Sequence, residues 1–488
     1  MEADIRVLVL HTSCCYLDEV RLLCGLERHP LFSGVEFHHA LVDGLPCPYA
    51  AQLPRPIADN CATNNRAAFQ LLASNGRRVH SLRDHAQAPV RTRFDSGTIE
   101  APSMLDVRYR SLNLWEIVKC SAAATLQWES LRRTVSAGLS EHELATVKAL
   151  MVDAVRHIEA MDLLLCAVQP THCVLFNGFF HRERAAVELC QLHGVAAIAI
   201  ESSTFRNFKH FSQSGMAGNR NDWALLGRNR VNVRAIMAAE KAQLDALMMD
   251  KLLGRGNFIQ QAPRRGGARQ RLCIPPDAKL AIFLGQVPHD SAITGDDLAF
   301  CDVLEAVELL IAQFGSELAD VFLIIRLHPG GSVTSLRDDL LARRYANAAL
   351  PANIRVVAGL SENTFDLMEI ADVAITCSSQ AGLEALWLRK PLVVLGNPYY
   401  AGKGFTRDVT DKESLTLALR SSLQAPLSQR HADQLEVFLY GLIFEYLVPI
   451  SRDASTLTER GFQMMRNMLS GRHRLHGLVQ PPLHDPDN

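Results

Sequence analysis

Short apolar runs alternate with segments of helical periodicity along the C-terminal half of this chain. The runs are four to six residues long and rich in valine, isoleucine and leucine, as in strands buried on both faces of a sheet. The intervening segments predict helices beginning near Asp297, Ser335, Ser361 and Ser379. Such repeated β-α units indicate a parallel sheet with helices on both faces. Its strands are expected at residues 280–284, 322–327, 354–358, 373–376 and 392–395.

The N-terminal half opens with the same alternation and then becomes more helical. Residues 44–103 are rich in Pro, Asn and Gly and indicate only one short element, at 79–82. Two long amphipathic helices are expected at 112–135 and 141–168. A helix that ends at Gly194 separates two later strands, which makes a further β-α-β unit. Strands are expected at 5–10, 36–41, 173–176 and 195–200, with a helix at 17–26 between the first two.

The expected fold class is α/β, with two Rossmann-like β-α-β domains that face a cleft. A chain of 488 residues is too long for one ordinary hydrophobic core. The segment Gly254–Arg271 contains Arg264, Arg265, Arg269 and Arg271, and a solvated linker explains them more simply than an anion site does. We place the domains at 1–255 and 256–430, followed by helices at 431–470 and a frayed tail at 471–488.

The composition argues against a nucleic-acid-binding, a disulfide-bonded and a membrane-spanning protein. A net charge of −2 gives no electrostatic reason to expect nucleic acid as a partner. The 12 cysteines lie in apolar segments without paired C-x-x-C spacing, so we expect reduced core residues. The N-terminus leads directly into a strand and no apolar run is long enough to cross a bilayer, so we expect a cytoplasmic protein whose contact with the inner membrane is at most peripheral.

The segment after the strand 373–376 has the pattern of an anion site. Ser378 and Ser379 precede a helix, where hydroxyls, free backbone N–H groups and the helix dipole suit a phosphate. Gly382 would allow close approach of a ligand, and Glu384 could accept hydrogen bonds from ribose hydroxyls. The simpler alternative is that the serines only cap a helix. Lys403, which lies between two glycines after the next strand, can reach the same anion.

Polar residues also follow other strands of both predicted sheets. Because ligands bind outside the carboxyl ends of parallel strands, these residues are candidates for one site. Each has a plainer alternative: Asn177 as a turn residue before glycine, His328 as a structural histidine and Asp290 as a helix cap. No Asp-x-Asp metal pair stands at a strand end, and Asp296–Asp297 is interpreted as a capping pair. The candidates are Asn177, Glu201, Gln286, His289, Asp290, Ser291, Arg326, His328 and Glu362.

The residues and spacing of these motifs resemble those of the capsule polysaccharide biosynthesis family. This family includes the retaining β-Kdo transferases of the GT-B type. The resemblance covers about residues 172–410 and is strongest over 280–406. It departs from the family after Glu201, where serine replaces the usual glycine. The motifs are Gln286-x-x-x-Asp290-Ser291, Leu327-His328-Pro329, Ser378-Ser379-x-x-Gly382-x-Glu384, Lys390-Pro391 and Tyr400-x-Gly402-x-Gly404-x-Thr406.

The resemblance implies a glycosyltransferase that takes Kdo or a related ulosonic acid from a CMP-sugar and transfers it with retention. The acceptor would be a glycan or glycolipid, within a capsule assembly system at the inner membrane. Asp290 would be the nucleophile, assisted by Gln286 and His328. Other residues would hold the donor without a metal: Arg326, Ser378, Ser379, Gly382, Glu384 and Lys403. Asn177 and Glu201 would lie on the acceptor side. A UDP-sugar transferase or epimerase and a non-catalytic assembly component are the alternatives.

Overall fold

The structure is a computed structural model. It describes residues 5–12, 17–42, 67–73, 76–85, 103–203, 205–217, 238–253, 266–295, 300–328, 340–346, 348–359, 361–453 and 455–471. Several expectations lie outside these residues: those for Arg264, Arg265, Asp296, Asp297, Pro329, the segment 43–66 and the tail 472–488.

The first domain is built on a seven-stranded sheet with the order β15-β8-β7-β6-β1-β2-β3. Five strands are parallel, whereas β8 and β15 run antiparallel to their neighbours. Alternate side chains of β1 enter the two cores on opposite faces of the sheet, Leu8 and Leu10 on one side and Val7 and Val9 on the other. The strands are β1 (Ile5–His11), β2 (Val35–Leu41), β3 (Arg78–Ser81), β6 (His172–Phe176), β7 (Ala196–Ser202), β8 (Phe208–Ser212) and β15 (Val448–Pro449).

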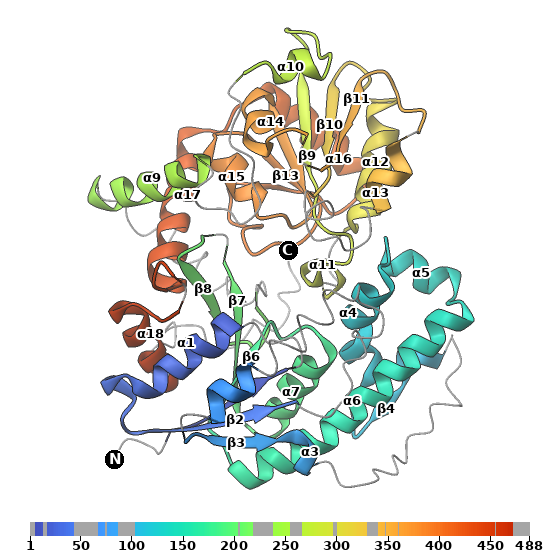
Figure 1. Cartoon of the computed structure of the whole chain (residues 1–488). Helices are drawn as coiled ribbons and strands as arrows, with labels where there is room; N and C mark the ends of the chain where they lie inside the picture. The colour runs from blue at the N-terminus through green and yellow to red at the C-terminus, as the bar shows by residue number, and fades with distance from the viewer. Residues whose placement is uncertain are drawn as a thin grey trace, which may run out of the picture.

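Helices cover both faces of this sheet (Figure 1). One face packs against α4 (Leu114–Leu126), α6 (Glu141–Val168) and α7 (His181–Leu192), and the other against α1 (Leu17–Arg28) and α18 (Glu459–Leu469). The smaller elements are η1 (Pro30–Phe32), α3 (Leu82–His85), η3 (Ser103–Asp106), β4 (Arg108–Tyr109) and β5 (Leu112–Asn113). The helix expected over 141–168 is confirmed to the residue.

The single helix expected over 112–135 is wrong. The chain forms α4 and then α5 (Leu131–Ala137), because Gln127 adopts a left-handed conformation with φ 55° that ends α4. Trp128 is buried, with its indole N–H donating to Glu143 Oε1 at 2.7 Å. Ser130 then caps α5 by accepting from the N–H of Arg133. The apolar periodicity of the sequence continues across Gln127, so the pattern does not show that the helix ends there.

The second domain is a six-stranded parallel sheet with the order β11-β10-β9-β12-β13-β14. Successive residues of β9 enter different cores, Ile282 on one face and Phe283 on the other, so both faces of the sheet are buried. This confirms the expected α/β class. The strands are β9 (Leu280–Leu284), β10 (Phe322–Arg326), β11 (Ile354–Val357), β12 (Val373–Thr376), β13 (Leu392–Val394) and β14 (Arg407–Asp408).

The helices expected near Asp297, Ser361 and Ser379 begin later than the sequence indicated, and the start expected near Ser335 lies outside the described residues. Asp302 and Glu305 form a capping box, so the first long helix begins at Val303. Asn363 caps the helix that was expected near Ser361. Two helices, α10 and α16, were not expected. The helices are α10 (Ala268–Arg271), α11 (Ser291–Thr294), α12 (Val303–Phe314), α13 (Leu340–Ala346), α14 (Thr364–Ile370), α15 (Ala381–Trp387) and α16 (Lys412–Gln424).

The C-terminal helices connect the two domains. α17 (Gln429–Gly441) and the π-helix η5 (Leu442–Tyr446) pack in the second core, together with α9 (Ala238–Leu252). The chain then returns to the first domain, where β15 pairs with β8 and α18 covers the sheet (Figure 1). The boundary expected near residue 255 lies outside the described residues, and α9, which precedes it, already packs with the second core.

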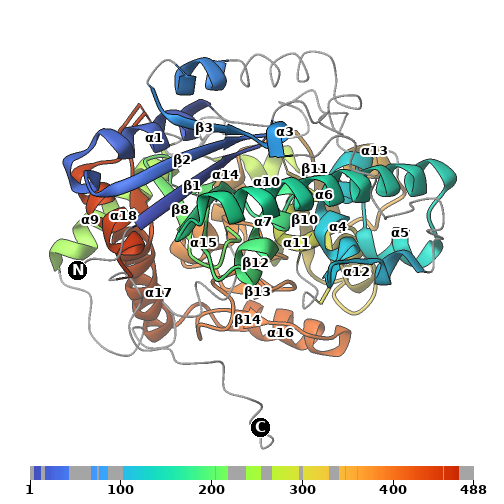
Figure 2. The ribbon, with the colours of Figure 1, turned by 90° about the horizontal axis from the view of Figure 1, so that it is seen from below.

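Polar contacts join the domains a second time, between α5 and the helices α12 and α13 (Figure 2). Ser130 Oγ donates to the carboxylate of Asp302, so the caps of α5 and α12 are bonded to each other. Arg133 pairs with Glu308 at 2.5 Å, and Arg344 bridges Glu308 and Glu129. These contacts fix the first domain against the second on the side away from α17.

Eight cysteines lie in the described part of the chain, and none of them forms a disulfide. Six are buried, as expected, but Cys166 and Cys273 are exposed, so the expectation of core residues fails for these two. In the residues that the structure describes, no helix combines the length and the apolarity that crossing a membrane requires.

His210 makes the stability of the first domain depend on pH. Burial, and secondarily Lys209, lowers the pKa of His210 to about 3. An unfolded histidine binds its proton near pH 6.5, so stability is lost as the pH falls from about 6.5 toward 3. When the pH is lowered from 7 to 5, the unfolding free energy of the parent should fall by about 2 kcal/mol more than that of His210→Asn, as measured by urea denaturation. An equal loss in both proteins would contradict this.

Candidate active site

The loops that follow β9 and β12 are bonded to each other. These strands are neighbours in the second sheet, and the N–H of Ser378 donates to Gln286 Oε1 at 2.8 Å. The N–H of Ser379 donates to Thr376 Oγ1 at 3.1 Å, and the N–H of Ala381 donates to Ser379 Oγ at 3.3 Å. The expectation of free backbone N–H groups is therefore wrong for these three residues. An anion at this loop would be bound by the serine hydroxyls and by neighbouring side chains.

Gly382 has a packing role. It is buried, and a Cβ built on it would lie 2.5 Å from the hydroxyl oxygen of Tyr400. That hydroxyl donates to the carbonyl of Ser379, so Tyr400 supports the serine loop from behind. The glycine is needed for this contact, which gives it a reason other than the close approach of a phosphate.

Glu384 is paired within the protein. Its carboxylate lies 2.7 Å from Lys251 Nζ on α9, and both side chains are buried. The same ammonium group lies 5.2 Å from the centre of the Phe205 ring. The structure thus places Glu384 in an ion pair between α15 and α9, in contrast to the expected contact with ribose. Lys251 was missed because nothing in the local sequence distinguishes it from the exposed lysines of an amphipathic helix.

Arg326 is the last residue of β10, and His328 lies two residues after it, beside the loop after β9. Arg326 is buried, and its guanidinium donates to the carbonyl of Val357 and to Thr364 Oγ1. Burial, and secondarily Arg326, lowers the pKa of His328, so its imidazole is neutral at pH 7. Glu362, after β11, is held by both nitrogens of an Arg271 fork at 2.7 and 2.8 Å. Arg271 is thereby part of the fold rather than of a solvated linker.

Asp290 caps the four-residue helix α11. Its Oδ1 accepts from the N–H of Ala292 at 2.9 Å, which is the alternative that the sequence left open. Burial raises the pKa of Asp290, and this hydrogen bond opposes the shift. Burial also lowers the pKa of His289 to about 4, so its imidazole is neutral. The cap uses Oδ1 of Asp290, and the other carboxylate oxygen takes no part in it.

On the first domain, Asn177 and Glu201 come together as expected for neighbouring strand ends. Asn177 adopts a left-handed conformation with φ 57°, and its Nδ2 donates to Glu201 Oε2 at 2.7 Å. Burial raises the pKa of Glu201, while Asn177 and Lys209 act in the opposite direction. Lys209 lies 2.5 Å from Glu19 and donates to Ser202 Oγ, so a polar cluster lines the end of β7.

A histidine chain reaches the same edge of the first sheet and was missed in the sequence. His11 ends β1, beside β6, and its Nε2 lies 2.9 Å from Nδ1 of His39. His39 in turn contacts the carboxylate of Glu27. The feature of the sequence that could have revealed this chain is a histidine at the end of the first strand, His11, together with a histidine in the second strand, His39. Burial, and secondarily His39, lowers the pKa of His11, so its imidazole is neutral.

The carboxyl edges of the two sheets meet at one junction. α11, which follows β9, lies between the domains and against α4 (Figure 1). A Cβ on Gly295 would lie 2.8 Å from the ring of Phe179, which directly follows Asn177 and Gly178. The segment 285–295, which carries Gln286 and Asp290 and ends after α11 at Gly295, therefore contacts the loop that carries Asn177. Of the predicted residues, those on the β9, β12, β6 and β7 ends lie around this junction.

The buried pair Lys251–Glu384 gives a test of the two roles of Glu384. Glu384→Gln leaves a buried ammonium without its anion, which should lower the unfolding free energy by about 3–5 kcal/mol in urea denaturation. Combining it with Lys251→Met should recover most of that loss. A single variant as stable as the parent, but with weakened nucleotide binding, would assign Glu384 to the ligand instead.

Comparison with known proteins supports the sequence resemblance over the second domain. Residues 245–436 match the family model described as capsule polysaccharide biosynthesis protein. A search of curated proteins finds no match.

Likenesses to solved structures are distant. One is KpsC, a beta Kdo 2,4 transferase from Thermosulfurimonas dismutans, at 20% identity and TM-score 0.43 over 62% of this chain and 88% of that one. Another is the glycosyltransferase SnogD from Streptomyces nogalater, at 13% identity and TM-score 0.28 over 93% and 98%. A third is a UDP-GlcNAc 2-epimerase from Methanocaldococcus jannaschii, at 9% and 0.29 over 90% and 100%.

Because these TM-scores are below 0.5, we base function on the family match and on the geometry of the junction. Residues 245–436, the segment with the serine loop and Asp290, match the model of the capsule polysaccharide biosynthesis family.

Proposed function

We propose that this protein is a nucleotide-sugar-dependent glycosyltransferase of capsular polysaccharide biosynthesis, with a glycan or glycolipid as acceptor. One observation carries the proposal: the loop with Gln286 and Asp290 is bonded to the serine loop on one side and packs against the Asn177 loop on the other. Donor and acceptor groups from two domains thus meet at one junction, which a transfer reaction requires. The family match over 245–436 supports the same conclusion.

The donor is held by the second domain. The hydroxyls of Ser378 and Ser379 donate to its phosphate, and Lys403 supplies positive charge from a turn in which Gly402 and Gly404 have positive φ. His328, as a neutral imidazole, donates a hydrogen bond to the leaving phosphate. These groups offset phosphate charge without a divalent cation. We propose CMP as the nucleotide and Kdo or a related ulosonic acid as the sugar.

Transfer with retention follows from a nucleophile at Asp290. The carboxylate attacks the anomeric carbon as the bond to the CMP oxygen breaks, and CMP leaves with the electron pair. An acceptor hydroxyl then displaces the carboxylate and gives its proton to a base at the junction. Two displacements restore the configuration at the anomeric carbon. The raised pKa of Asp290 places the acid limit of activity at higher pH than an ordinary aspartate would, because only the ionised form attacks.

Thermal-shift measurements identify the nucleotide. A ligand that binds only the folded protein raises the melting temperature by mass action, so CMP and CMP-sugars should raise it while UDP and GDP should not. The shift should persist in EDTA, and Ser378→Ala with Ser379→Ala should reduce it. A shift with UDP that needs magnesium would favour a UDP-sugar transferase or epimerase. No shift with any nucleotide would favour a non-catalytic assembly component.

Asp290→Asn separates chemistry from capping. Asparagine keeps the hydrogen bond to Ala292 but cannot act as an anionic nucleophile, so the transfer rate should fall by several orders of magnitude with little change in stability. Asp411→Asn is a matched control, because Asp411 caps the distant α16 through the N–H of Ser414 at 2.7 Å. Incubation of the parent with donor alone should leave a sugar on the Asp290 peptide in mass spectrometry. Full activity of Asp290→Asn would make Asp290 a structural residue.

A further inference from the structure

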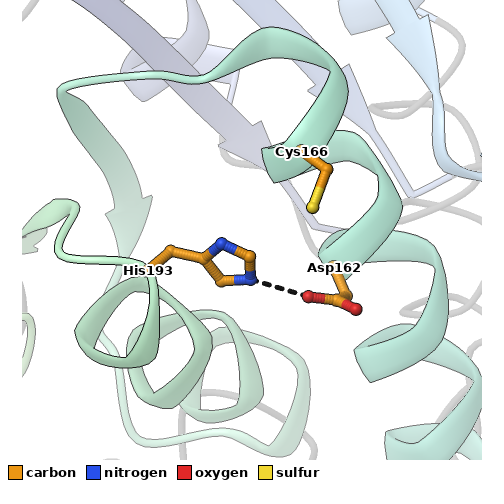
Figure 3. A group of neighbouring side chains, drawn as sticks. All are labelled: Asp162, Cys166 and His193. Carbon is orange, nitrogen blue, oxygen red and sulfur yellow. Dashed lines mark hydrogen bonds and ion pairs between the residues drawn. The ribbon is translucent and has the colours of Figure 1, made fainter.

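Three side chains with metal-binding atoms meet on the first domain, away from the junction. Asp162 and Cys166 lie one turn apart on α6, and His193 directly follows the last residue of α7. Their ligand atoms lie within 4.8 Å of one another, the one such group of three found in the residues that the structure describes. Figure 3 shows the Cys166 sulfur and the Asp162 carboxylate both directed toward the His193 ring.

The fold holds all three backbones in place. Residues four apart on a helix lie on the same face, which aligns Asp162 with Cys166. α6 and α7 share the core on one face of the sheet, and Leu164, Leu165 and Leu189 are among its buried side chains. Gly194, with φ 69°, turns the chain immediately after His193 and leads it into β7. The three ligands therefore come from rigid helix ends rather than from a long loop.

The two carboxylate oxygens of Asp162 contact different partners. Its Oδ1 lies 2.6 Å from His193 Nε2, and its Oδ2 accepts from Arg110 Nη1 at 2.6 Å. Arg110 comes from the β4–β5 turn and also donates to Glu159. The arginine orients the carboxylate from the outer side, as partners of metal-binding carboxylates do, and leaves Oδ1 facing histidine and cysteine.

We propose that Asp162, Cys166 and His193 bind a zinc ion. Thiolate, imidazole and carboxylate are the ligand types of zinc, whereas magnesium and calcium prefer oxygen alone. Three protein ligands leave a fourth tetrahedral position for water. Binding replaces the proton on Cys166 Sγ and moves the imidazole proton of His193 from Nε2 to Nδ1, so that Nε2 is the ligand atom.

The ion would act as a clamp between helix ends. α7 runs from the carboxyl end of β6 to the amino end of β7, so His193 lies at the opposite edge of the sheet from Asn177 and Glu201. Zinc would tie the C-terminal turns of α6 and α7 together and stabilise the first domain. It takes no part in the proposed transfer reaction, which is why failure of one proposal leaves the other standing.

Cobalt titration tests the site on the reduced, metal-free full-length protein. Cobalt bound to a thiolate gives charge-transfer absorption in the near ultraviolet that oxygen and nitrogen ligands do not give. We expect this band at one ion per chain, its loss on addition of zinc, and its absence in Cys166→Ser. His193→Ala should weaken zinc binding by more than about tenfold in calorimetry. Cys273→Ser, which removes the other cysteine that is exposed in the described part of the chain, should bind as the parent does.

Melting temperatures show whether misfolding causes the loss of metal binding in a variant. In EDTA the parent, Cys166→Ser and Cys273→Ser should melt at similar temperatures, and zinc should raise the melting temperature of all but Cys166→Ser and His193→Ala. A parent without the charge-transfer band, or equal binding by Cys166→Ser and Cys273→Ser, would overturn the proposal and leave Asp162–His193 as a simple ion pair.

Discussion

The direction of the strands is the constraint on which the candidate site depends. All six strands of the second sheet and five of the seven in the first run parallel to their neighbours, so the residues that follow each strand gather at one edge of its sheet. The return of the chain through α17 to β15 fixes the two sheets relative to each other. Only with both conditions do Gln286, Ser378 and Asn177 lie around a single junction.

Most polar groups at this junction already have partners in the protein. Three N–H groups of the serine loop are bonded, and Glu384, on the helix that follows this loop, is paired with Lys251. Such pairing makes the loops rigid before a ligand arrives, which favours preorganised binding. It also reduces the groups that a donor can contact to hydroxyls and to a few cationic or neutral side chains. The proposed donor site would therefore recognise a ligand by charge and shape more than by a dense set of backbone contacts.

The first domain offers a different chemistry. Asn177, Glu201, Lys209 and Glu19 form a hydrogen-bonded cluster, and His11 is connected through His39 to Glu27. Burial raises the pKa of Glu201 and lowers the pKa of His11, so both shifts favour the uncharged form of the side chain. In the proposed transfer reaction the acceptor hydroxyl must lose a proton, and Glu201 and its neighbours are the groups that we propose lie on the acceptor side. The contrast between the two edges agrees with a division into donor and acceptor sides.

The sequence by itself determined the class of fold and many of its elements, because buried strands and amphipathic helices are set by local apolar patterns such as those of Leu280–Leu284 and Glu141–Val168. It also located the candidate residues, since they lie at or shortly after the carboxyl ends of the expected strands. Only the tertiary structure decided their partners. Lys251 and Glu384 are 133 residues apart, and Asp162 and His193 meet only because α6 packs beside α7. The sequence pattern records which face of an element is apolar, but not which other element covers it, and the choice of partners follows from that packing.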